Sequence, residues 1–113
     1  MAISVILKDI ETGSVDEVVI DNPDSRRCFS YVDNEKCNCE MCIYDDGLCF
    51  FRETEDHLLE LHFRKNNYAK ITSAEGELKL SAKILDFNLN DDILVVRYII
   101  EDQEKEIKVI YRS

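Results

Sequence analysis

The chain has 113 residues, 45% hydrophobic and 34% charged, and its 24 acidic and 14 basic side chains give a formal net charge of −10. This composition predicts one globular domain over residues 1–113 and excludes a disordered chain. The negative charge argues against a nucleic-acid partner, which would need clustered Lys and Arg.

The sequence also predicts no membrane partner, because no apolar run is long enough for a transmembrane helix. The apolar stretch at the N-terminus is short, lacks a basic flank and meets charge at Lys8 and Asp9. These features are not those of a signal peptide, so we expect a cytoplasmic protein.

Alternation of apolar and polar residues with a period of two dominates the chain and indicates half-buried β-strands. We predict strands near residues 2–10, 15–20, 27–33, 37–44, 48–53, 57–64, 67–72, 77–85, 93–100 and 105–112. The clearest case is 77–85, where four apolar residues fall on one face of the strand: Leu78, Leu80, Ala82 and Ile84.

Turn signals separate these segments. Asp46-Gly47 lies between two apolar runs and predicts a hairpin, and the short link from Asp102 to Glu104 predicts another near the end of the chain. Residues 53–62 have an alternative interpretation as a short helix capped by Thr54, but the alternation of Leu59, Leu61 and Phe63 favours a strand. We therefore expect little or no helix.

About eight to ten strands at this spacing, joined by short turns, predict an all-β antiparallel fold. Consecutive hairpins favour an up-and-down β-barrel, which also removes exposed strand edges.

The order of strands and turns in the C-terminal part of the chain also suggests a family. The residues that carry it are Asp46-Gly47 before Leu48 to Arg52, the strand ending at Phe63, Tyr68 to Ile71, Gly76 to Leu80, and the terminal hairpin from Ile93 to Tyr111. This arrangement resembles the YwiB-like family of small uncharacterised bacterial proteins. The resemblance implies a lipocalin-like (calycin-type) barrel in a bacterial cytosol, and it implies no catalytic residues.

Aromatic side chains supply candidates for a ligand cavity. Phe50, Phe63, Tyr98 and Tyr111 lie at inward or boundary positions of the predicted strands. They could line a cavity, as in lipocalin-like barrels, or fill the interior.

The five cysteines are the most unusual feature, and three of them, Cys37, Cys39 and Cys42, form a C-x-C-x-x-C cluster. Thiolates at this spacing could hold zinc, although on an extended strand Cys42 would face away from the other two. In a cytosolic chain with an odd number of cysteines we expect free thiols rather than disulfides, and we expect no cofactor apart from this zinc alternative.

Three functions remain open at this point. The first is a non-enzymatic protein that binds a small apolar or amphipathic ligand in the barrel. The second is an interaction module, such as a homodimer, formed through an apolar strip of Ile93, Val95 and Ile99 on the outer face. The third is a zinc or redox role for the cysteine cluster. We do not expect an enzyme, because no acid, base and nucleophile assemble in the sequence.

Overall fold

The computed structural model describes residues 1–112, which form ten antiparallel strands and no helix. That part of the chain therefore contains no helix long and apolar enough to cross a membrane. The strands are β1 (Ala2–Asp9), β2 (Val15–Asp21), β3 (Cys28–Val32), β4 (Asn38–Tyr44), β5 (Gly47–Glu53), β6 (His57–Phe63), β7 (Tyr68–Ser73), β8 (Gly76–Leu89), β9 (Ile93–Ile100) and β10 (Gln103–Arg112).

The strands form one continuous sheet in the order β2-β1-β10-β9-β8-β7-β6-β5-β4-β3. Each strand from β3 to β10 pairs with its neighbour in sequence, and β1 returns to pair with β10. The sheet curls into a nearly closed up-and-down barrel, with an open seam between its two edge strands, β2 and β3. The all-β barrel expected from the sequence is confirmed.

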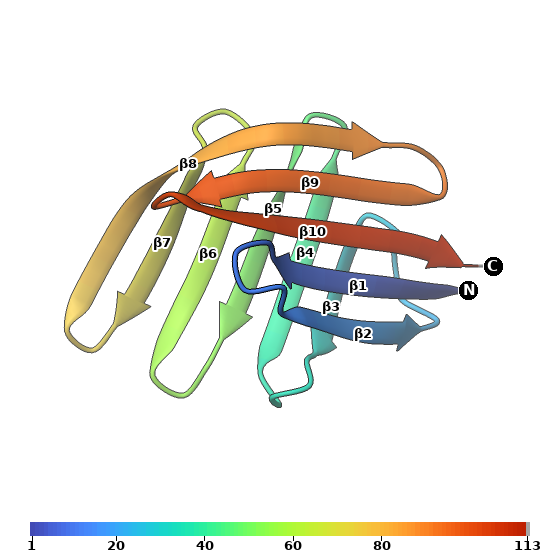
Figure 1. Ribbon diagram of the computed structural model, residues 1–113. Coiled ribbons are helices and arrows are strands. Elements are labelled where there is room, and N and C mark those ends of the chain that lie inside the picture. Colours follow the sequence, from blue (N-terminus) through green and yellow to red (C-terminus); the bar gives the residue numbers. More distant parts are fainter. Residues whose placement is uncertain (113) are drawn as a thin grey trace.

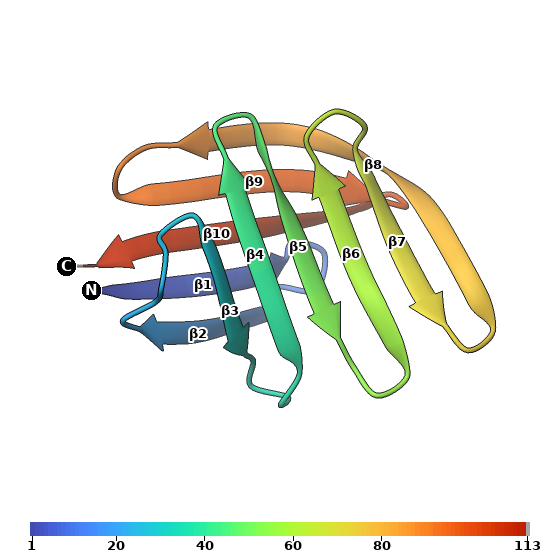
Figure 2. The same ribbon diagram turned by 180° about the vertical axis from the view of Figure 1, so that it is seen from behind.

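The barrel is flattened into two layers, whose strands cross at a steep angle (Figures 1 and 2). One layer contains β1, β2, β9 and β10, and the other contains β3 to β7. The long strand β8 joins them, because its first part pairs with β7 and its second part pairs with β9.

A β-bulge at Leu85 allows β8 to serve both layers. Ile84 pairs with Tyr98 and Asp86 pairs with Arg97, so Leu85 has no partner in the register and is 40% exposed. The extra residue shifts the inward positions from even numbers, such as Ile84, to odd numbers, such as Phe87. The strand predicted for 77–85 therefore continues to Leu89, and Phe87 and Leu89 still pack against the core.

The core fills the space between the two layers. Its fully buried side chains come from β1, β3 to β7, β9 and β10, whereas β2 and β8 contribute only partly buried ones. In β9 the predicted alternation is confirmed: Leu94, Val96 and Tyr98 are buried, and Ile93 and Val95 are only partly buried.

Two of the predicted turns lie one or two residues earlier than the sequence suggested. Asp45 and Asp46 form the β4–β5 turn, and Gly47 is the first residue of β5. A Cβ on Gly47 would overlap the carbonyl oxygen of Phe63 in β6, so glycine is required by close strand packing rather than by the turn. The β9–β10 turn consists of Glu101 and Asp102, both with positive φ, as in a type I′ hairpin.

Candidate functional site

A cavity of about 290 Å³ lies inside the barrel, near the end at which β3 runs into its turn to β4. Its inner wall is apolar and includes Val5 and Leu7 of β1, Phe50 of β5, and Leu59 and Leu61 of β6. All five occupy inward positions of the period-two alternation in their strands. The cavity is therefore a direct product of the barrel's strand register.

The rim of this cavity is charged because an arginine occupies an inward position. Leu48 and Phe50 face the core, and two residues later the same face of β5 presents Arg52. The Arg52 guanidinium donates from Nε to Asp33 Oδ2 at 2.7 Å and from Nη2 to Glu35 Oε2 at 2.8 Å. This side chain thus links β5 to the β3–β4 turn across the mouth of the cavity.

Asp33 organises that turn. Its Oδ1 accepts hydrogen bonds from the backbone N–H groups of Glu35 (3.0 Å) and Cys37 (2.9 Å), and its side chain is only 14% exposed. Burial alone would raise the pKa of Asp33, but the hydrogen bonds from Arg52 and the two backbone amides outweigh burial and hold the pKa below its ordinary value. Asp33 is therefore an ionised, fully engaged carboxylate.

A second ion pair lies on the opposite side of the rim. Lys105 of β10 donates from Nζ to Oδ2 of Asp9 at 3.1 Å, and this hydrogen bond lowers the pKa of Asp9. The neighbouring Tyr98 is buried, and burial raises the pKa of its phenol, so its hydroxyl stays protonated at neutral pH. Three cationic and five carboxylate side chains line the cavity, which gives its rim a net negative charge.

The predicted cavity residues divide into two pairs. Phe50 and Tyr98 line the cavity. Phe63 is instead a packed core residue, with its ring 4.9 Å from that of Tyr98, and it is not among the lining residues. Tyr111 lies apart from the cavity: its hydroxyl donates to the carbonyl oxygen of Arg26 at 2.9 Å, and the Arg26 guanidinium lies over its ring.

The three cysteines predicted as zinc ligands do not come together. Cys42 is bonded to Cys28 in a disulfide, Cys39 is buried on the inner face of β4, and Cys37 lies in the turn before β4. Burial and the nearby Asp33 carboxylate raise the pKa of Cys39 to about 11, so it remains a thiol rather than a metal-binding thiolate. Within residues 1–112, no group of three or more His, Cys, Asp or Glu side chains has a geometry that could hold a metal ion.

The expectation of five free thiols also fails at one pair, because Cys28 and Cys42 form a disulfide. They are direct cross-strand partners with Cα atoms 4.1 Å apart, a proximity that their spacing in sequence does not reveal. The rim residues Asp33 and Arg52 were not predicted from the sequence. For Arg52 one signal was available, a charged residue at an inward position two residues after Phe50.

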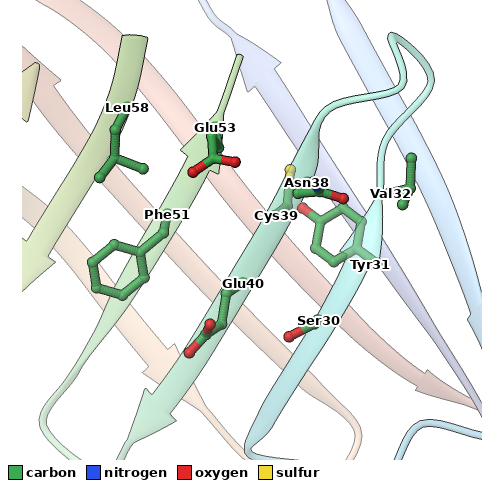
Figure 3. A pocket seen from close by; sticks show the side chains of 9 residues that line it. All are labelled: Ser30, Tyr31, Val32, Asn38, Cys39, Glu40, Phe51, Glu53 and Leu58. Atoms are coloured by element: carbon green, nitrogen blue, oxygen red, sulfur yellow. The ribbon is translucent and has the colours of Figure 1, made fainter. Parts of the chain in front are cut away.

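A second hollow, more open to solvent, lies on the sheet of β3 to β6 (Figure 3). Most of its lining side chains face outward, including Phe51 and Leu58 beside the carboxylates of Glu40 and Glu53. It lies against one layer only, whereas the interior cavity has residues of both layers in its wall and is less open to solvent. The interior cavity is therefore the better candidate for a binding site.

No protein-family model matches the chain, and no curated protein matches it. Among solved structures, the chain is similar to the crystal structure of the YwiB protein from Bacillus subtilis, with 14% identity and a TM-score of 0.40. The match covers 99% of this chain and 89% of that chain. This likeness is a coarse one in strand arrangement, and it assigns neither a site nor a ligand.

Proposed function

We propose that this protein binds a small amphipathic molecule in the barrel cavity. The observation that supports this function is the combination of an apolar inner wall with a charged rim in one cavity between the two layers. Small-molecule sites in proteins have this character: they are concave and mainly apolar, with a few polar groups that orient the ligand. The lipocalin-like relation and the cytoplasmic setting expected from the sequence are further proposals, and the up-and-down strand order supports the first of them.

The size and charge of the cavity restrict the ligand. A volume of about 290 Å³ is near the lower end for ligand pockets and equals about ten water molecules in the liquid. The excess of carboxylates over cations at the rim disfavours an anionic head group. We therefore propose a short apolar body with a neutral or cationic polar head.

Binding rather than catalysis fits the chemistry of the rim. The Asp33 carboxylate is held ionised by hydrogen bonds from Arg52 and two backbone amides and is a weak base, and the Cys39 thiol near it has a raised pKa. Arg52 is engaged by two carboxylates. These groups stabilise one another and can orient a polar head, but none of them is poised to transfer a proton at neutral pH.

The proposal can be tested with three six-carbon probes that carry different head groups: hexylamine, hexanol and hexanoate. Isothermal titration calorimetry should give a Kd of about 1 mM for hexanol and hexylamine, in the range expected for so few buried atoms, and weaker binding for hexanoate. Failure of all three probes to bind the folded protein would contradict a ligand cavity of this size.

Two adjacent positions in β6 provide a matched pair of variants. Leu59 lines the cavity, whereas Leu58 faces the outer hollow. Leu59→Trp should fill the cavity and weaken hexanol binding at least about tenfold, and Leu58→Trp should leave binding unchanged. Because the chain contains no Trp, the introduced indole also reports folding by its fluorescence. Equal loss of binding in both variants would place the probe outside the cavity.

A further inference from the structure

A row of sulfur-containing and aromatic side chains crosses the outer face of the layer formed by β3 to β7. The strand register places Cys28, Cys42, Cys49, His62 and Tyr68 directly opposite one another, one on each successive strand. Three cysteines thus lie side by side on one face. The sequence does not reveal this row, because the cysteines are separated by 14 and 7 positions, whereas the cluster it suggested included Cys37 and Cys39.

Cys42 occupies the middle of the three cysteines. The N–H of Ile43 donates to the carbonyl of Arg27 at 2.7 Å, so the next pair, Cys28 and Cys42, is a non-hydrogen-bonded pair with closely spaced Cα atoms. That pair carries the disulfide. Cys49 is the direct partner of Cys42 on its other side and remains a free thiol. On this side Cys42 and Cys49 form a hydrogen-bonded pair, because the N–H and C=O of Cys42 point away from β3. The Cα atoms of such a pair lie about 5.5 Å apart, which is within the range that a disulfide spans.

Cys49 has a base beside it. The Nδ1 atom of His62 lies 3.8 Å from Cys49 Sγ, and its Nε2 lies 3.1 Å from the Glu60 Oε1 atom. With Nε2–H donating to this carboxylate, Nδ1 keeps its lone pair and can accept the thiol proton. Tyr68 stacks on the imidazole, with ring centroids 4.7 Å apart, and fixes its orientation. Burial raises the pKa of the Cys49 thiol, an effect that Arg64 opposes, so formation of the thiolate depends on such a base.

We propose that Cys28, Cys42 and Cys49 form a thiol–disulfide exchange site with His62 as its base. In the internal step, His62 takes the proton of Cys49, and the Cys49 thiolate attacks Sγ of Cys42. The Cys42–Cys49 bond forms, the Cys28–Cys42 bond breaks, and Cys28 leaves as a thiolate. The step is redox-neutral, because one disulfide replaces another, and it needs no external oxidant or reductant.

Cys28 is the most exposed of the three cysteines in the row. It is exposed on the edge strand β3, beside a hollow of about 370 Å³ at the open seam of the barrel. Asp21, Asp24 and Glu40 are among the residues that line this hollow. Their charge favours a cationic low-molecular-weight disulfide over an anionic one as the reaction partner. In a reducing compartment, disulfides are usually transient and have catalytic or redox-sensing roles.

The first experiment tests whether the Cys42–Cys49 bond can form. Fully reduced protein is oxidised with cystamine, a cationic disulfide that accepts two electrons and yields two cysteamine molecules, and the bonds are mapped by mass spectrometry after acid quenching. Wild type should give Cys28–Cys42, and Cys28→Ser should give Cys42–Cys49. Cys37→Ser is the matched control, because it removes a free thiol outside the row and should leave the Cys28–Cys42 bond intact. If folded Cys28→Ser gives no Cys42–Cys49 bond, the proposal is wrong.

The second experiment measures the exchange itself. Oxidised wild type is incubated with iodoacetamide, which should alkylate the Cys28 thiolate that the exchange releases and leave a Cys42–Cys49 bond. Cys49→Ser should abolish labelling of Cys28, and His62→Phe, which keeps an aromatic ring next to Tyr68, should slow it at least tenfold. Circular dichroism verifies that each variant is folded. Labelling of Cys28 at the wild-type rate in Cys49→Ser, or in His62→Phe, would overturn the assigned roles.

Discussion

The ion pair between Asp33 and Arg52 should stabilise the fold much more than a surface ion pair does, because it lies at the cavity mouth in a partly dehydrated setting. The side chains are 14% and 22% exposed. Removing one partner of a fully buried pair costs about 3–5 kcal/mol, but the remaining exposure and the two backbone donors to Asp33 reduce that cost. We expect Arg52→Met to lower the free energy of unfolding by about 2–3 kcal/mol.

A double-mutant cycle that combines Arg52→Met with Asp33→Asn separates the interaction energy of the pair from the effects of the two single substitutions. Urea unfolding followed by far-UV circular dichroism should give a coupling energy of about 1.5–2 kcal/mol. The exposed pair Arg27–Asp45, with side chains 51% and 93% exposed, provides the control, and its cycle should give less than about 0.5 kcal/mol. A coupling energy for Asp33–Arg52 as small as that of the control pair would contradict the claim that burial strengthens this ion pair.

Three further predictions concern stability. Gly47→Ala should lower the free energy of unfolding, measured with urea, by about 3 kcal/mol, because the new Cβ would overlap the Phe63 carbonyl oxygen. An unchanged unfolding midpoint would contradict this requirement for glycine. Replacing Glu101-Asp102 by Asn-Gly should stabilise the protein by about 1 kcal/mol, because both residues have positive φ; a lower melting temperature would contradict the type I′ assignment. The folded-state pKa of Asp33 is lowered, so its stabilisation is complete above the unfolded-state pKa of about 3.9 and is lost as the pH falls through the lower folded value. The stability difference between wild type and Asp33→Asn, measured by urea unfolding, should therefore shrink below about pH 4, and a difference that grows with acid would reverse the assigned sign.

Much of the fold could be predicted because period-two alternation is a local signal. Each strand requires only its own residues to define an inner and an outer face, and short turns then favour sequential hairpins. The continuation of β8 beyond residue 85 was missed because the bulge at Leu85 changes which positions face inward. Periodicity alone does not distinguish such a shift from the end of a strand.

The sites were harder to predict because they depend on register between strands. Cys28, Cys42 and Cys49 become neighbours only once the pairing of β3, β4 and β5 is known. Sequence proximity instead grouped Cys37, Cys39 and Cys42, but Cys39 and Cys42 lie on opposite faces of β4 and Cys37 lies in the turn before it. Arg52 was overlooked because a charged residue near the end of a strand is ordinarily solvated, whereas here two acidic side chains of the β3–β4 turn cover it.

The central claim, a barrel cavity that holds a small amphipathic molecule, is tested most directly by native mass spectrometry. The protein would be purified without refolding and compared with the Leu59→Trp variant prepared in the same way. We expect an organic adduct of low mass on the wild type, lost from the cavity-filled variant and released on denaturation. The bare chain mass for wild type, together with no adduct after incubation with hexanol or hexylamine, would contradict it.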